Sequence, residues 1–195
     1  MALDADILTN LMLATSGATG PQSPLIWGAY ARGVVNGLKL SIANGVAVGA
    51  AGLGELKGVG AIHGGPLAMV PIVASNMLGV GMPPAPGQAL FNLAISQIAT
   101  HTLTALEISG PTPGTGSGAG TIPPGGYVVP GPLIAQLITV EILSAGITPT
   151  PIQPLINLAI GNSTQQIMAL ASTPFTVTGP AGSSPGGGPV IGIIS

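Results

Sequence analysis

Hydrophobic residues recur along this chain at helical spacing in two kinds of segment, a short one and a long one, and each kind occurs three times. The short segments are residues 5–17, 66–81 and 132–146. In the first of them the apolar side chains fall on one helical face: Ile7, Leu8, Leu11, Met12 and Leu13. We therefore expect a helix in each short segment, although Val70, Ile72 and Val73 leave a strand open as the alternative in the second.

Capping residues set the bounds of the short helices. Asp4 or Asp6 is placed to cap the first one, because a carboxylate accepts hydrogen bonds from the free N–H groups of a first turn. Gly17, Gly81 and Gly146 follow the three segments where a helix would end. Proline-marked connectors come next, and we interpret their prolines as structural spacers that stiffen the link to the following helix.

The long segments are residues 24–43, 89–107 and 154–172, and they predict amphipathic helices. Leu90, Ile95 and Ile98 lie on the apolar side of the second one, whose other face is polar but uncharged. Such a face suits packing against another protein surface. In the first long segment four small residues would allow a close approach between helices: Gly28, Ala29, Ala31 and Gly33.

A Gly-rich tail ends each set of segments, at residues 46–62, 106–131 and 174–194. Short β-branched runs flank turns of Gly, Ser and Pro, so we predict two short strands and a long loop in each tail. We expect the tails at 111–132 and 178–195 to pair with neighbouring chains by strand addition.

These segments repeat with a period of 65 residues, which divides the 195-residue chain into thirds. Leu25, Leu90 and Leu155 lie one period apart and are expected in equivalent buried positions. The sequence therefore predicts an α+β fold of three tandem 65-residue repeats, 1–65, 66–130 and 131–195. Each repeat would run helix, proline connector, helix and Gly-rich β-arm, and the three would close as a pseudo-threefold body and one structural unit.

Charge is scarce, at 4% of residues against about 25% in ordinary soluble domains. From Ile142 to Ser195 no side chain is ionisable, so much of the surface needs a partner to cover it. The chain has three cationic side chains, too few to neutralise many backbone phosphates, which argues against nucleic-acid binding. Acids stand near the N-terminus where a signal peptide has basic residues, so no signal peptide is expected. Leu, Ile and Val are too frequent and too regular for a disordered chain.

Candidate chemistry is correspondingly thin. His101 occupies the position of Asn36 and Gln166 in the other repeats, which indicates a hydrogen-bonding role, and His63 is interpreted as a turn residue. Glu107 and Glu141 have no acidic counterpart one period away, and there is no cysteine. We discount the sequon at Asn162, and expect core or interface roles for the aromatic residues, Trp27, Tyr30, Phe91, Tyr127 and Phe175. No catalytic, cofactor-binding or metal-binding residue is predicted, and no cofactor.

These features favour a non-enzymatic structural protein that self-assembles into a large symmetric complex. A virion component, in a phage capsid or tail, is the leading interpretation, with copies of itself and neighbouring structural subunits as partners. The alternatives are a membrane-associated or pore-forming protein, or an extracellular filament or surface-layer subunit. Prolines and glycines cut the apolar runs to lengths below the about 20 residues that span a bilayer, which counts against the membrane alternative.

Overall fold

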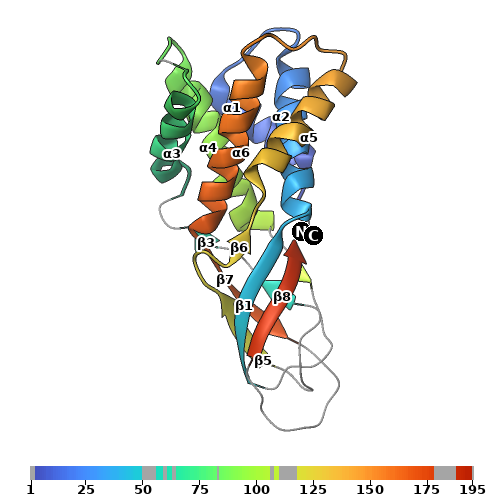
Figure 1. The fold of residues 1–195 in the computed structure, drawn as a ribbon, viewed down its shortest axis with the longest axis vertical. Coiled ribbons are helices and arrows are strands. Elements are labelled where there is room, and N and C mark those ends of the chain that lie inside the picture. Colours follow the sequence, from blue (N-terminus) through green and yellow to red (C-terminus); the bar gives the residue numbers. More distant parts are fainter. Residues whose placement is uncertain are drawn as a thin grey trace.

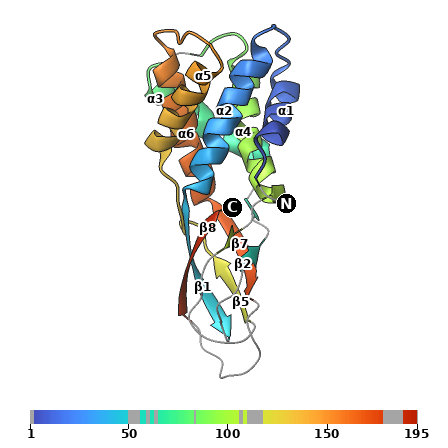
Figure 2. The same cartoon turned by 90° about the vertical axis from the view of Figure 1, so that its right-hand side faces the viewer.

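Helices gather at one end of the molecule and strands at the other (Figures 1 and 2). The computed structural model describes residues 3–49, 56–58, 61–62, 65–82, 84–105, 108–109, 118–177 and 188–194. Within these ranges there are six helices, which we call the helical head: α1 Ala5–Ser16, α2 Ser23–Lys39, α3 Gly65–Gly79, α4 Gln88–Ala105, α5 Gly131–Ser144 and α6 Gln153–Ala169. They form three helical hairpins, α1–α2, α3–α4 and α5–α6. The second helix of each hairpin begins 65 residues after the second helix of the hairpin before it.

The capping residues act as the sequence predicts. Asp4 is the N-cap of α1, and its carboxylate accepts from the backbone N–H of Asp6 at 2.7 Å and of Ile7 at 3.2 Å. Gly17, Gly81 and Gly146 have φ of 63°, 85° and 73°, the left-handed conformation that glycine adopts without strain. The strand alternative for the second short segment is wrong, since residues 65–79 are helical around Pro71.

The three hairpins contact one another in a closed cycle. Each first helix packs against its own partner and against the second helix of another hairpin, so that α1 lies on α4, α3 on α6 and α5 on α2. Helix α6 also contacts α2 and α4. Ala29, Ala94 and Ala159, one period apart on the second helices, are all fully buried. The core of the head is therefore shared among all three hairpins.

Helices α2 and α5 approach closely because α2 carries glycine where they meet. A Cβ atom at Gly33 would stand 2.7 Å from the backbone N and Cα of Ile138, and one at Gly37 would stand 3.3 Å from Ile134 Cβ. Both isoleucines are fully buried. The close approach predicted for Gly33 is confirmed. At Gly28, by contrast, the nearest atoms to an added Cβ would be those at the flexible end of Arg32.

The strands belong to an antiparallel sheet in the order β2-β7-β5-β1-β8-β4, with β3 on β7 and β6 on β1. Each described pair joins strands from different thirds of the chain, as where Val46 faces Thr121 and Ala43 faces Gly192. The bounds are β1 Ile42–Gly49, β2 Leu56–Gly58, β3 Ala61–Ile62, β4 Ile108–Ser109, β5 Gly118–Ile122, β6 Tyr127–Val128, β7 Ala171–Val177 and β8 Gly188–Ile194.

The predicted α+β fold, with three 65-residue repeats that each end in a β-arm of their own, is wrong. The part of the chain whose side chains are placed is mostly helical, and the strands do not make a separate arm on each repeat. The physical reason is that an isolated two-stranded ribbon is marginal in water, and glycine in a strand supplies no side chain to pack. The strands find their hydrogen-bond partners in other thirds of the chain instead.

The strands described within the two tails expected to add to neighbouring chains have partners in their own chain. In the tail at 111–132, strand β5 has β1 on one side and β7 on the other. In the tail at 178–195, strand β8 lies between β1 and β4. Among the described residues β4 pairs with β8 only at Ile193 and Ile194, and residues 111–117 and 178–187 lie outside the described ranges, so strand addition to neighbouring chains stays a prediction.

Candidate functional site

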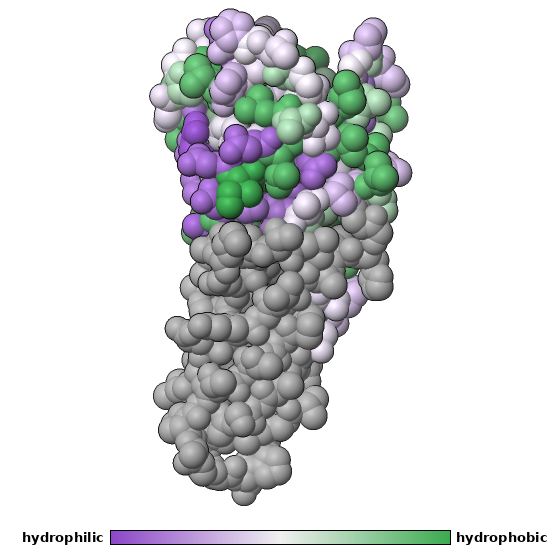
Figure 3. All heavy atoms as spheres, turned by 180° about the vertical axis from the view of Figure 1, so that it is seen from behind, coloured by the Kyte–Doolittle hydropathy of each residue, from purple (hydrophilic) through white to green (hydrophobic). Residues whose placement is uncertain are grey.

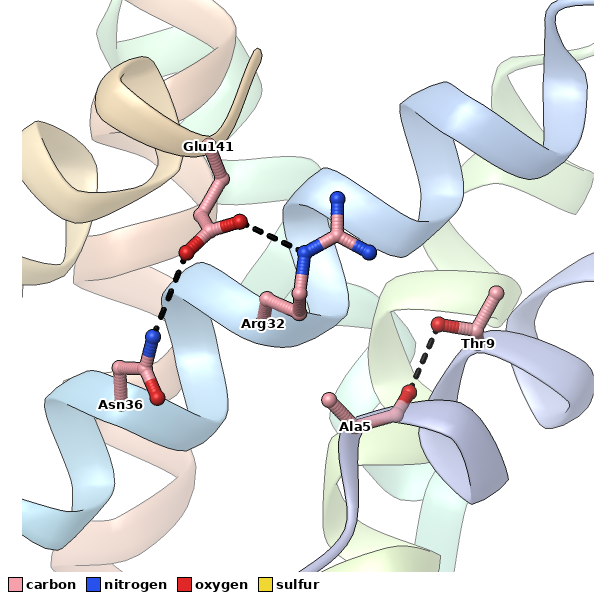
Figure 4. A network of polar contacts seen from close by, with 5 residues as sticks. All are labelled: Ala5, Thr9, Arg32, Asn36 and Glu141. Atoms are coloured by element: carbon pink, nitrogen blue, oxygen red, sulfur yellow. Dashed lines mark hydrogen bonds and ion pairs between the residues drawn. The ribbon is translucent and has the colours of Figure 1, made fainter. Parts of the chain in front are cut away.

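A polar network joins α2 to α5 on the side of the helical head (Figure 4). Arg32 Nε donates to Glu141 Oε2 at 2.6 Å, and Asn36 Nδ2 donates to Glu141 Oε1 at 3.4 Å. The Arg32 and Glu141 side chains are 40% and 22% exposed, so water screens their attraction. In the same view Thr9 bonds only its own helix, at Ala5 O. The network ties two hairpins together and brings no nucleophile to the carboxylate.

His101 and Gln166 lie one and two periods of 65 residues after Asn36, and they make the corresponding contacts in the other hairpins. His101 on α4 reaches the start of α1, and Gln166 on α6 reaches Asn76 on α3 through two hydrogen bonds of 3.3 and 3.4 Å. Asn36, His101 and Gln166 thus each bond across to a different hairpin. The predicted hydrogen-bonding role of His101 is confirmed by this contact.

Of these three residues His101 is the titratable one, and it is buried, with 1% of its surface exposed. Its Nε2 accepts the backbone N–H of Asp4 at 3.0 Å, so the ring is neutral there and carries its proton on Nδ1. Burial lowers the pKa of His101, against a weaker opposite effect of the Asp4 carboxylate. Asp4 in turn has its pKa lowered, first by the Ile7 N–H and then by the Asp6 N–H. The ring fixes the N-terminus of α1 onto α4.

Aromatic side chains from two hairpins meet near the start of α2. Trp27 and Tyr30 lie edge to face at 5.6 Å, and Phe91 of α4 lies 5.4 Å from Trp27. Gln153 of the third hairpin donates to the Tyr30 hydroxyl at 2.9 Å, and burial raises the pKa of Tyr30. Trp27, Tyr30 and Tyr127 are buried, as the sequence predicts; the side chain of Phe175 lies outside the described residues. The cluster is core packing completed by one polar contact.

The end of the head away from the sheet, which we call the tip, consists of the described residues 17–25, 80–82, 84–90 and 145–155. Leu25, Leu90 and Leu155 are each the third residue of a second helix and are 47%, 50% and 39% exposed. The prediction that these leucines are buried is wrong. They lie in first turns, where the neighbouring helices have already ended in their connectors, so nothing in the described structure covers them.

The remaining candidates from the sequence are His63, Glu107 and the sequon at Asn162. His63 and Glu107 lie outside the described residues, so the turn interpretation of His63 stays a prediction. Asn162 is half-buried in α6, and the following Ser163 and Thr164 are fully buried and donate to the backbone of their own helix. Burial in a helix explains why this sequon is a poor acceptor for a glycan.

The described ranges hold neither a metal centre nor a membrane span. Among those residues, no three His, Asp or Glu side chains come close enough to hold a metal ion. None of the helices found there combines the length and the apolar character needed to cross a membrane. No protein-family model, curated protein or solved structure matches this chain.

Proposed function

We propose that this protein is a non-enzymatic structural subunit, which assembles with copies of itself and with neighbouring structural subunits into a large symmetric complex such as a virion. The observation that carries the proposal is the character of the exposed surface. Large hydrophobic side chains are exposed on all three hairpins, and charged ones are few.

Thirteen large hydrophobic residues are exposed among those whose side chains are placed. The same part of the chain holds five charged side chains: Asp4, Asp6, Arg32, Lys39 and Glu141. Figure 3 shows hydrophobic residues lying among hydrophilic ones over one face of the head. Scattered apolar residues are common on the surfaces of monomers. When exposed apolar residues outnumber charged ones, however, little electrostatic repulsion remains to keep copies of the protein apart. Such a surface fits a protein that works inside an assembly.

The polar contacts support a structural role as well. The Arg32–Glu141 pair, the His101 contact and the Gln166–Asn76 pair all hold one hairpin against another. An acid–base or nucleophilic centre instead places a reactive group toward a bound substrate. In the described structure these residues instead hold the hairpins together, which supports a structural role.

The experiment is the size and shape of the purified full chain in detergent-free buffer. Light scattering coupled to gel filtration gives the mass, and negative-stain electron microscopy shows the particle. We expect a discrete assembly many times larger than the 18.8 kDa chain. A monomer at all concentrations, or solubility only in detergent, would overturn the proposal, and the second result would favour the membrane alternative. For the virion role, mass spectrometry of virus particles from the same source should detect the chain.

A further inference from the structure

We infer that the tip is a self-association surface, and that its occupant is the tip of a second copy of this chain. The inference rests on the proposed function, because it names one contact through which the assembly forms. Leu25, Leu90 and Leu155 carry it. Each stands at the same position of a different hairpin, and each is at least 39% exposed.

The geometry directs these leucines outward from the head. Each lies in the first turn of its helix, and helical side chains lean toward the helix N-terminus. Strand β1 follows α2 and strand β7 follows α6, so the N-termini of these helices lie at the end opposite the sheet (Figures 1 and 2). Leu78 and Leu143, near the ends of α3 and α5, add exposed apolar surface at the same end, at 55% and 56%.

A hydrogen-bonded turn leads into each second helix at the tip. In the three connectors the backbone N–H groups of Ser23, Gln88 and Gln153 donate to the carbonyls three residues earlier, at 2.9, 2.9 and 3.0 Å. A proline stands two residues before each of these donors. Because the turns are already fixed, little conformational freedom is lost when the leucines become buried, which favours association.

Two observations point to a second copy as the occupant. The three leucines stand at equivalent positions of three hairpins that contact one another in a cycle. An identical tip presents the same three leucines in return, which is what a self-complementary twofold contact requires. The sequences 17–25, 80–90 and 145–155 also hold no ionisable residue, so two tips meet without charge repulsion or the desolvation of charges.

The test compares the wild-type chain with the triple variant Leu25→Gln, Leu90→Gln and Leu155→Gln. The matched control is Leu67→Gln, because Leu67 is 76% exposed and lies in the first turn of α3, at the sheet end of the head. Analytical ultracentrifugation over a concentration series should show the tip contact weakened at least about a hundredfold in the triple variant and unchanged in the control. Unaltered circular dichroism would show that all the proteins are folded.

A cross-linking experiment tests the contact in an almost unchanged chain. The protein has no cysteine, so Leu90→Cys and Leu67→Cys each provide one unique thiol. A short bismaleimide should link two chains through residue 90 and not through residue 67. If the wild-type protein assembles and the triple variant assembles equally well, the tip contact is overturned and the proposed function stands. The same conclusion follows if the protein assembles but residue 90 gives no cross-link. A wild-type chain that stays monomeric overturns both.

Discussion

Replacing Gly33 with alanine tests whether close packing of α2 on α5 holds the helical head together. The new Cβ would stand 2.7 Å from the backbone N and Cα of Ile138. Carbon atoms in contact are about 3.5–4.0 Å apart, so the helices would have to separate by roughly 1 Å. The obstacle is backbone, so no change of rotamer relieves it. Ile134 and Ile138, both fully buried, would lose contacts along the whole helix pair.

The magnitude follows from two opposing effects. Overpacking a core costs about 1–3 kcal/mol, and a clash with backbone belongs at the upper end of that range. Alanine in place of glycine returns up to about 1 kcal/mol through helix propensity. We therefore expect Gly33→Ala to lower the free energy of unfolding by about 2 kcal/mol. For a chain of this size that corresponds to a fall in melting temperature of about 4–8 °C.

Gly28→Ala is the matched control on the same helix. A Cβ there would stand 3.0 Å from Arg32 Nη1, the end of a flexible side chain that can move aside. Only the propensity gain remains, so the melting temperature should stay constant or rise. Both variants are measured by thermal and urea unfolding, followed by circular dichroism at 222 nm. The packing argument fails if Gly33→Ala is as stable as the wild type, or if both variants shift in the same direction.

Four further predictions concern ionisation and strand pairing. Because His101 is neutral in the fold and its pKa is lowered, the unfolded chain binds the extra proton first as the pH falls. Stability should therefore fall as the pH drops below about 6.5. In a profile of melting temperature against pH, His101→Gln should remove that part of the fall. The lowered pKa of Asp4 adds a second loss in more acidic solution, which Asp4→Asn should abolish. Glu141→Gln should lower the free energy of unfolding by less than about 1 kcal/mol in urea titrations, because water screens the pair with Arg32; a larger loss would show that the pair is more than a surface contact. Removing residues 188–195 takes β8 away from β1 and β4, although β1 keeps β5 and β6, so the exposed strand edges should make the truncated chain aggregate and become sensitive to protease; a soluble, resistant product would contradict the strand pairing.

The local elements of this fold could be predicted from the sequence because their signals are local. Asp4 precedes an apolar helical stripe, and Gly17, Gly81 and Gly146 end such stripes, so the helices and their ends follow from capping and periodicity. The hydrogen bond of His101 was predictable in kind, since Asn and Gln stand one period away. Its partner, the backbone N–H of Asp4, was not, because nothing local specifies which hairpin contacts which.

The strand partners and the exposed leucines escaped prediction for different reasons. Register in a sheet is set by alternation of side chains, and Gly-rich strands such as β5 carry almost none, so their pairing cannot be worked out from the pattern. Leu90 belongs to an apolar stripe that is buried further along α4, as at Ile95 and Ile98. Periodicity identifies that face but does not reveal where along the helix the neighbouring helices stop. The signal that could have identified the tip is the Pro-rich connector directly before each leucine.

The pairing of strands from different thirds of the chain has a consequence for the order of events during synthesis. Strand β1 emerges early, yet one of its long neighbours is β8, whose residues are made almost 150 positions later. Helix α2 likewise packs against α5, which is synthesised much later. Contacts between residues so far apart in sequence form slowly, and apolar segments stay uncovered in the meantime. Because so few charges keep growing chains apart, the unfinished chain is prone to aggregate until its later segments have been made.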